Sequence, residues 1–105
     1  MHDVIIIGAG PAGYTAGIYC ARARRDTLLI SGILPGGQLM NTTDVENYPG
    51  FSDGIMGPDL MAVMRKQTEK MGTKIIDDEV TSVDFKNRPL KVKTASEEFE
   101  ARAVI

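Results

Sequence analysis

The sequence VIIIGAGPAG near the N-terminus restricts the fold most strongly, because a consecutive apolar run leads directly into glycines. Residues 4–7 show no alternation of apolar and polar side chains, a pattern typical of a parallel strand that helices bury on both faces. Pro11 suits the first turn of a helix, where its missing N–H is not needed, and we predict a helix over residues 12–24. A second buried strand is expected at residues 27–30, which completes a β-α-β unit with a right-handed crossover.

The side chains of the predicted helix indicate which side packs on the sheet. Small residues and one aromatic residue recur at helical spacing, and we expect this side to contact the strands closely. These residues are Ala12, Ala16, Tyr19 and Ala23.

The middle of the chain predicts a long loop followed by a second helix. Residues 31–57 are rich in Gly, Pro, Asn, Thr and Asp, and a loop of this length in a compact domain is usually functional. Within it, the sequence LPGG at residues 34–37 suits a type II turn with a positive φ at Gly36. The helix is predicted over residues 58–71, with Gly72 as its C-terminal stop. Its regularly spaced methionines predict core packing rather than a ligand-binding surface.

After Gly72 the pattern changes to strands. Residues 74–77 predict a third buried strand, and alternating residues at 80–86, 90–94 and 99–105 predict a three-stranded antiparallel meander. The fold class is therefore α/β, a Rossmann-like domain with a parallel sheet, flanking helices and this meander. Because the sequence stops on the apolar run ARAVI, we expect a partial domain of a longer protein. A short native chain with a buried last strand is the alternative.

Gly8, Gly10 and Gly13 form the pattern G-x-G-x-x-G between the predicted strand and helix. In dinucleotide-binding folds the first glycine permits the tight turn, the second lets a pyrophosphate approach the backbone, and the third allows close packing of the helix. The N–H groups and the positive partial charge at the start of the helix then bind the phosphates. Because a strand precedes the motif and a helix follows it, dinucleotide binding is favoured over a purely structural turn.

The residues after the second strand bear on which dinucleotide is bound. Asp or Glu usually binds the ribose there, but this chain has Ser31 followed by Gly32. A serine hydroxyl binds ribose more weakly than a carboxylate does, so NAD is not favoured. Arg22, Arg24 and Arg25 precede the second strand, and we expect them to complement the helix dipole rather than bind the 2′-phosphate of NADP.

The segment GGQLMNTTDVENYPGF, residues 36–51, is longer than a simple dinucleotide domain needs. A flavin ring is large and flat with polar edges, so it requires amide donors and acceptors and a close backbone. The segment offers such groups at Gly36, Gly37, Gln38, Thr42, Thr43 and Asn47. A surface loop made of turn residues is the alternative that composition alone favours.

The segments GAGPAGYTAGIYCARA, GGQL and TDVENYPGF, together with NRP at residues 87–89, resemble the N-terminal FAD-binding part of the low-molecular-weight thioredoxin reductases. The resemblance covers nearly the whole chain. It implies that the glycine motif binds the FAD pyrophosphate, that Ser31 and Gly32 lie by the ribose, and that Val80 meets adenine through its backbone. The implied FAD-binding residues are Gly8, Gly10, Pro11, Ala12, Gly13, Ser31, Gly32, Gly37, Gln38, Leu39, Thr43, Asn47 and Val80, those from Gly37 to Asn47 lying along the flavin and ribityl chain.

The resemblance also implies a function for the longer protein. In this family, electrons pass from NADPH to FAD, then to a C-x-x-C disulfide in a separate NADPH-binding domain, and then to a thioredoxin-like protein. Residues 1–105 are expected to be the N-terminal part of the FAD-binding domain, and they hold neither a C-x-x-C pair nor a second glycine motif. No catalytic residue is therefore expected among them, and alone they are expected to be inactive. A homodimer in the cytoplasm is implied as well.

Two other functions are compatible with the same residues. A related flavoprotein without redox cysteines, such as a ferredoxin/flavodoxin–NADP reductase of the thioredoxin-reductase type, would use the same FAD domain. A non-catalytic nucleotide-binding module would bind adenine nucleotides and no flavin. A C-x-x-C pair further along the gene would distinguish the first of these from a thioredoxin reductase.

Composition argues against several other classes. The formal net charge of −2 offers no basic surface for nucleic acid or an anionic membrane, and no apolar run is long enough to span a bilayer. Cys20 is the only cysteine; it cannot form an internal disulfide, fits a reducing cytoplasm, and is expected to be a buried packing residue. The acidic residues 77–79 are expected to form a solvated turn, and no spacing predicts a metal site.

Overall fold

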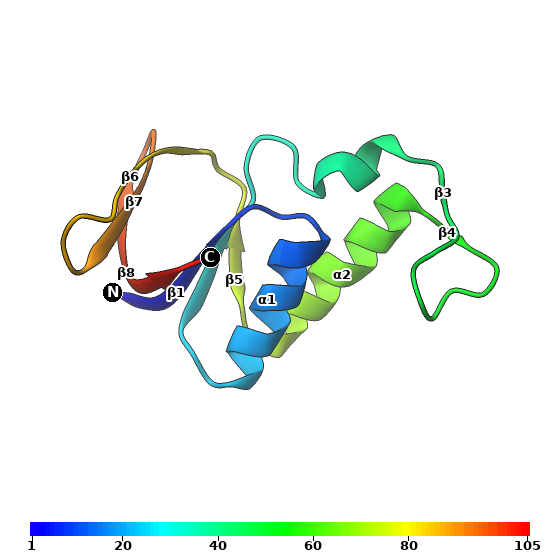
Figure 1. The fold of residues 1–105 in the computed structure, drawn as a ribbon, viewed down its shortest axis with the longest axis horizontal. Coiled ribbons are helices and arrows are strands. Elements are labelled where there is room, and N and C mark those ends of the chain that lie inside the picture. Colours follow the sequence, from blue (N-terminus) through cyan, green and yellow to red (C-terminus); the bar gives the residue numbers. More distant parts are fainter.

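Strand β1 (His2–Ile7) lies in the middle of a six-stranded sheet in the computed structural model, which describes residues 1–105 (Figure 1). The strand order is β5-β2-β1-β8-β7-β6. The parallel part consists of β1, β2 (Thr27–Ile30), β5 (Lys74–Ile76) and β8 (Glu98–Val104). Strand β7 (Leu90–Thr94) pairs antiparallel with β8 and with β6 (Val80–Asp84). The predicted meander is thus confirmed, and β8 joins it to the parallel strands.

The two helices are α1 (Pro11–Arg22) and α2 (Gly57–Met71). Each has a proline in its first turn, as the sequence indicated. Helix α2 ends at Gly72, whose φ of 117° is the left-handed conformation of a glycine C-cap. Both helices therefore begin and end within one or two residues of the predicted positions.

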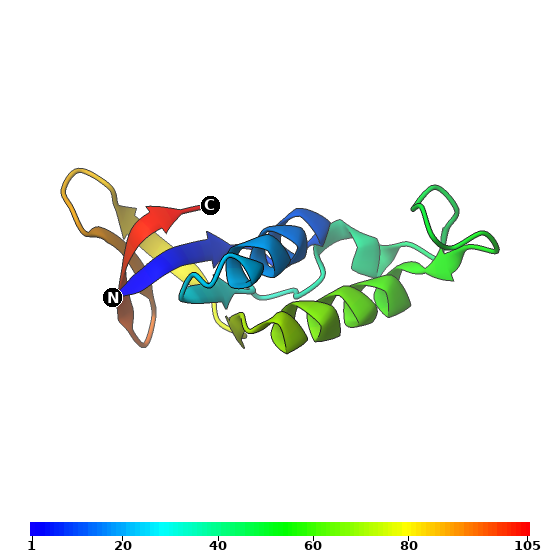
Figure 2. The ribbon, with the colours of Figure 1, turned by 90° about the horizontal axis from the view of Figure 1, so that it is seen from below.

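Three short elements interrupt the long loop, and sequence analysis did not predict them. They are the 3-10 helix η1 (Gly37–Asn41) and the two-residue strands β3 (Asp44–Val45) and β4 (Ile55–Met56), which pair antiparallel. The loop between β3 and β4 extends away from the sheet at one end of the long axis (Figures 1 and 2). The predicted type II turn is present, because Gly36 has φ 99° and the N–H of Gly37 donates to the carbonyl of Leu34 over 3.2 Å.

Strands β1 and β2 are packed on both faces, but only one face is covered by helices. On that face, Ile6 and Leu29 pack with Tyr14 of α1 and with Leu60 and Met64 of α2. On the other face, a second cluster combines residues of β1 and β2 with residues of the meander. It consists of Ile5, Leu28, Ile30, Val92 and Ala101. The meander thus buries the face for which helices were expected, which explains the consecutive apolar residues of β1.

Of the four residues predicted to face the sheet from α1, only Ala16 packs against the core, whereas Ala12, Tyr19 and Ala23 are exposed. The buried residues of α1 are Tyr14 and Gly17, whereas Tyr19 is 68% exposed. The inward side packs on α2 as well as on the sheet, and a Cβ at Gly17 would lie only 2.7 Å from Cγ2 of Thr68. The closest approach between α1 and α2 is therefore at a glycine of α1 rather than at one of its alanines. On α2, Leu60, Met61 and Met64 are buried, which confirms core packing for these two methionines, whereas Met71 is half-buried.

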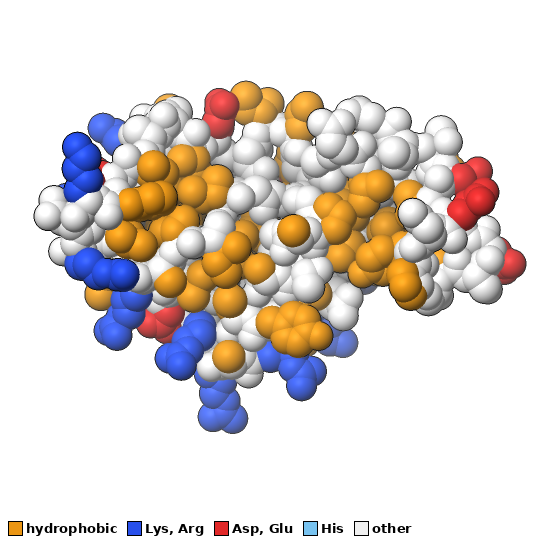
Figure 3. Space-filling model, in the orientation of Figure 1, with side chains coloured by type: hydrophobic (Ala, Val, Ile, Leu, Met, Phe, Trp, Pro, Cys, Tyr) orange, Lys and Arg blue, Asp and Glu red, His pale blue; other side chains and the backbone are white.

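Charged side chains are unevenly distributed on the surface. Figure 3 shows Lys and Arg at the end formed by the meander and along the lower edge, and acidic side chains at the opposite end over the β3–β4 loop. Arg22 lies in the last turn of α1, where a cation complements the helix dipole.

Neither helix combines the length and the apolar character that crossing a membrane requires.

Candidate dinucleotide-binding site

The glycine motif forms the turn from β1 into α1. Gly8 has φ 114°, and its N–H donates to the carbonyl oxygen of Ile30 over 2.9 Å, which ties the turn to β2. Apart from atoms of the adjoining backbone, no protein atom lies within 4 Å of the position that a Cβ would occupy at Gly8 or at Gly10. The space in front of this backbone is therefore open, as close approach of a ligand requires.

Gly13 has a different role, which is internal packing. A Cβ on this residue would collide with the carbonyl oxygen of Gly8 and would lie 3.6 Å from Cγ2 of Ile6. Only glycine permits α1 to start this close to the end of β1. The separate roles assigned to Gly8 and Gly13 from the sequence are thus visible in the geometry.

The positive partial charge at the N-terminus of α1 is not compensated by any side chain of its first turn. No side chain caps it, and no acidic residue lies in it. Pro11 has no N–H, and the N–H groups of Ala12 and Gly13 lie in the first turn, where an α-helix provides no acceptor for them. Such a terminus binds anions, and phosphate in particular.

The second glycine pair lies directly against this turn. The N–H of Gly36 donates to the carbonyl oxygen of Ala9 over 2.6 Å, and a Cβ at Gly37 would be 3.7 Å from Cα of Gly10. Gly37, Gln38 and Leu39 then form the start of η1, with Gln38 exposed and Leu39 packed against the core. The structure therefore brings together the two segments that sequence analysis assigned to pyrophosphate and flavin.

A cavity of about 340 Å³ lies at the carboxyl ends of β1 and β2. Its volume is within the usual range for small-molecule sites, and most of its lining is apolar. The lining residues are Ile7, Gly8, Ile30, Gly32, Ile33, Leu34, Glu79 and Val80. Three of the predicted residues, Gly8, Gly32 and Val80, meet here, whereas Glu79 and the apolar pair Ile33 and Leu34 were not predicted.

Ser31 lies outside this cavity lining. Its side chain is buried, with the residue 5% exposed, and its hydroxyl donates to Oδ1 of Asp77 over 2.9 Å and to the carbonyl of Gly32 over 3.1 Å. Arg65 of α2 binds the same carboxylate in a bidentate manner, over 2.8 and 2.9 Å. These hydrogen bonds from Arg65, together with that from Ser31, hold the pKa of Asp77 below its usual value.

Sequence analysis missed the part that Asp77 plays in this contact. The contact follows from the register of the sheet, because Ile30 of β2 lies opposite Ile76 of β5 in a parallel pair. The residues that follow two such strands meet at one edge of the sheet, so Ser31 and Asp77 become neighbours. Asp77 is thus an ion-paired residue rather than only part of a solvated turn.

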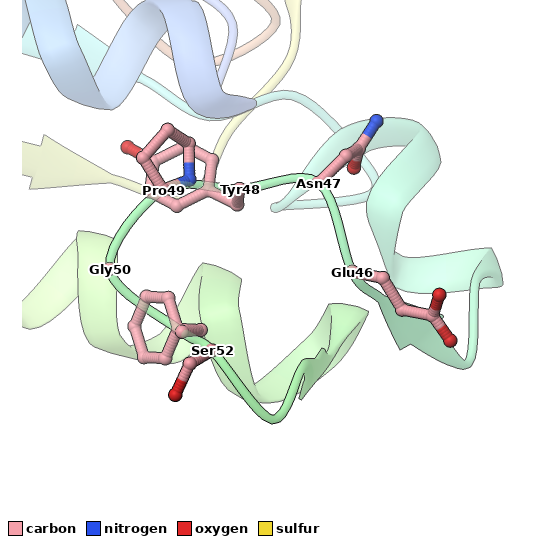
Figure 4. A pocket seen from close by; sticks show the side chains of 7 residues that line it. Glu46, Asn47, Tyr48, Pro49, Gly50 and Ser52 are labelled. Carbon is pink, nitrogen blue, oxygen red and sulfur yellow. The ribbon is translucent and has the colours of Figure 1, made fainter.

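Thr43 and Asn47 lie further along the loop. The carbonyl of Thr43 accepts a hydrogen bond of 2.8 Å from the N–H of Gly57, which holds this segment against the start of α2. Asn47 is exposed on the β3–β4 loop. That loop encloses a separate hollow of about 430 Å³, lined by residues 46–52, in which the rings of Tyr48 and Phe51 are 6.2 Å apart (Figure 4).

Comparison with known families decides the affiliation of this chain. The family model for pyridine nucleotide-disulphide oxidoreductases matches residues 2–105. The chain belongs to this family. The matched residues include the glycine turn, the start of α1 and all residues that line the cavity.

Several thioredoxin reductases are similar to this chain in sequence and structure. The thioredoxin reductase of Rickettsia bellii is 57% identical over 103 residues, which are 97% of this chain and 33% of that protein. The NADPH-dependent thioredoxin reductase 3 of Arabidopsis thaliana is 47% identical over 109 residues, covering 100% of this chain and 21% of that protein. The structure of thioredoxin reductase from Giardia duodenalis superposes with a TM-score of 0.93 at 40% identity, over 98% of this chain and 34% of that one. The chain spans about a third of the length of the bacterial relative that it matches.

The single cysteine of this chain lies in the second half of α1. Cys20 is a free thiol in α1 and is half-buried rather than fully buried as expected. It is the only cysteine in the sequence, so residues 1–105 contain no pair that forms a redox disulfide.

Proposed function

We propose that residues 1–105 bind FAD in a thioredoxin-disulfide reductase that uses NADPH to reduce a thioredoxin-like protein. The observation that carries this proposal is the contact between Gly36 and Ala9, which sets the GGQL segment beside the glycine turn. A dinucleotide site requires only the turn, whereas a flavin requires both segments at one place. The thioredoxin reductases among the similar proteins support the same function.

The pyrophosphate would be bound by the start of α1. The open backbone at Gly10 leaves room for phosphate oxygens, and the N–H groups of Ala12 and Gly13 supply donors. A side chain at Gly10 would project into that space. Pro11 keeps the first turn helical without requiring an acceptor for its nitrogen.

The adenosine end would occupy the apolar cavity beside β2. Gly32 and Val80 line this cavity, and a flat adenine ring fits between apolar side chains on either side of it. The backbone of Val80, at the start of β6, offers polar groups to the edge of the base. The hydrogen bond from Ser31 to Asp77 would hold the end of β2 in place next to this cavity.

The flavin end would lie along the segment that begins with η1. Gly37 allows close approach of the backbone, and Gln38 presents an exposed amide. Leu39, Thr43 and Asn47 complete the proposed contacts with the ring and the ribityl chain. Bound FAD would supply the electron-transfer chemistry, while these residues bind and orient it.

The remaining machinery of the proposed reductase lies outside residues 1–105. A redox C-x-x-C pair and an NADPH-binding domain are required, and Cys20 alone provides neither. Residues 1–105 would therefore be the N-terminal part of the FAD-binding domain and would reduce no disulfide by themselves. Assembly as a homodimer in the cytoplasm is part of the same proposal.

An absorption spectrum of the purified protein, followed by identification of the released cofactor, tests the proposal. We expect a yellow flavin band and release of FAD on denaturation, together with NADPH-dependent reduction of thioredoxin by the full-length protein. Reduction of ferredoxin or flavodoxin in place of thioredoxin would instead indicate the related NADP reductase. A colourless protein that binds adenine nucleotides and takes up no added FAD would refute flavin binding and indicate a nucleotide-binding module.

A further inference from the structure

The segment between β5 and β6 contains three consecutive acidic residues with different environments. Asp77 is held by Arg65 and by the hydroxyl of Ser31. The Oδ1 atom of Asp78 accepts from the N–H of Glu79 over 2.8 Å, and its Oδ2 atom accepts from the hydroxyl of Ser96 over 3.1 Å. The first two carboxylates therefore fix the conformation of the segment.

A backbone contact places this segment against the end of β2. The N–H of Gly32 donates to the carbonyl of Asp78 over 2.8 Å. Two adjacent residues after β2, Ser31 and Gly32, are thus hydrogen-bonded to two adjacent residues after β5, Asp77 and Asp78. The next residue, Glu79, is thereby held at the edge of the cavity that Gly32 also lines.

Glu79 differs from its two acidic neighbours in having no partner for its carboxylate. The side chain forms no hydrogen bond or ion pair, although its backbone N–H is bound by Asp78. It is also the only charged residue among the eight that line the cavity of about 340 Å³. An unpaired carboxylate on a residue that lines an otherwise mostly apolar cavity is available to bind the polar part of a ligand.

The end of β2, by contrast, offers no free acceptor of this kind. The usual acidic residue is replaced there by Ser31, whose hydroxyl hydrogen is already donated to Asp77. Two carboxylate oxygens suit the adjacent hydroxyls of a ribose, and hydrogen bonds to a carboxylate are stronger than those to a neutral oxygen. We propose that Glu79 binds the ribose hydroxyls of the adenosine moiety in place of an acidic residue at the end of β2. This inference rests on the proposed binding of a dinucleotide at the glycine turn.

A consequence is selectivity at the ribose 2′ position. The negative charge of Glu79 would attract a free hydroxyl and repel a phosphate placed there. The site would therefore accept the adenosine end of FAD and disfavour a 2′-phosphorylated adenosine.

The test compares ADP with 2′-deoxy-ADP in calorimetric titrations of the nucleotide-free full chain and of its Glu79→Gln variant. In the wild type, we expect loss of the 2′-hydroxyl to weaken binding about tenfold, whereas in Glu79→Gln the same loss has little effect. Glu100→Gln is the matched control, because Glu100 is exposed on β8 and does not line the cavity. It should retain the wild-type ratio.

An equal penalty for the missing hydroxyl in the wild type and in Glu79→Gln would overturn the proposal. Circular dichroism shows whether the variant is folded, and the exposed position of Glu79 favours retention of the fold. If selectivity for the hydroxyl depends on Glu79 but FAD does not bind, the ribose contact stands and the proposed cofactor fails. If neither ADP nor FAD binds, both proposals are refuted.

Discussion

The backbone N–H of Gly36 donates a hydrogen bond of 2.6 Å to the carbonyl oxygen of Ala9. This bond connects two segments that are separated by β2 and by the whole of α1. It uses only backbone atoms, and the Cβ position of Gly37 lies 3.7 Å from Cα of Gly10. The bond therefore holds the start of η1 close to the start of α1.

The substitution Gly36→Ala tests how far the site depends on this connection. Gly36 has φ 99°, and a Cβ there would contact the side chains of Met40 and Met61. We expect a loss of about 1–3 kcal/mol in the free energy of unfolding, measured with urea, and weaker FAD binding. Gly50→Ala is the control, since Gly50 has φ 103° but nothing lies within 4 Å of its Cβ position. Equal losses in the two variants would show that only backbone strain is involved.

The substitution Gly10→Val separates ligand binding from stability. The φ of Gly10 is −100°, which any residue adopts, and no atom lies within 4 Å of its Cβ position. We expect the fold to persist while FAD affinity falls at least about tenfold, equivalent to about 1.4 kcal/mol of binding free energy. Fluorescence titration with FAD measures the affinity. Retained affinity would show that the pyrophosphate is not bound at this position.

The substitution Gly13→Ala should produce the opposite result. The added methyl group would collide with the carbonyl oxygen of Gly8, so the start of α1 must move away from β1. We expect a decrease of about 1–3 kcal/mol in the free energy of unfolding, as overpacking usually causes. Gly10→Ala adds the same methyl group to the same turn without a collision, and its unfolding curve should stay close to that of the wild type.

The predictable parts of the structure are those that local sequence determines. Strand β1, the glycine turn that follows it and the positive φ of Gly36 follow from preferences of neighbouring residues, and all three are present. The inward side of α1 was predicted wrongly, because Gly17 rather than alanine marks the contact with α2. That contact depends on where α2 packs, which a pattern within α1 does not contain.

The positions of Asp77 and Glu79 were not predictable in the same way. Both depend on the register between β2 and β5, whose residues are more than 40 positions apart in the chain. The run of acidic residues alone is typical of a solvated turn. Two of these residues have hydrogen-bonded carboxylates and the third lines the cavity, a division that becomes visible only when the strands are paired.

The ion pair between Arg65 and Asp77 predicts an acid-sensitive contribution to stability. Hydrogen bonds from Arg65 lower the pKa of Asp77 in the folded state, so the pair stabilises the fold above the unfolded-state pKa of about 3.9. That stabilisation is lost as the pH falls through the lower, folded-state pKa. Because the side chain of Asp77 is 56% exposed, we expect a contribution of at most about 1 kcal/mol.

Unfolding free energies measured between neutral and acidic pH in the wild type and in Arg65→Met test this prediction. The difference between the two proteins should be largest at neutral pH and should shrink as Asp77 becomes protonated. Asp78, whose own carboxylate is bonded to the backbone of Glu79, remains in both proteins and cancels in the comparison. A difference that is constant with pH would contradict the assignment.

The pairing of β1 with β8 also bears on how the chain acquires its structure. His2 lies opposite Ala101, so one neighbour of the first strand is the last strand of the chain. During synthesis, the N-terminal segment must remain without that neighbour until residues 98–104 have been made. Contacts so distant in sequence slow folding, and an exposed strand edge invites aggregation in the interval. The parallel part of the sheet can therefore be completed only after residues 98–104 emerge from the ribosome.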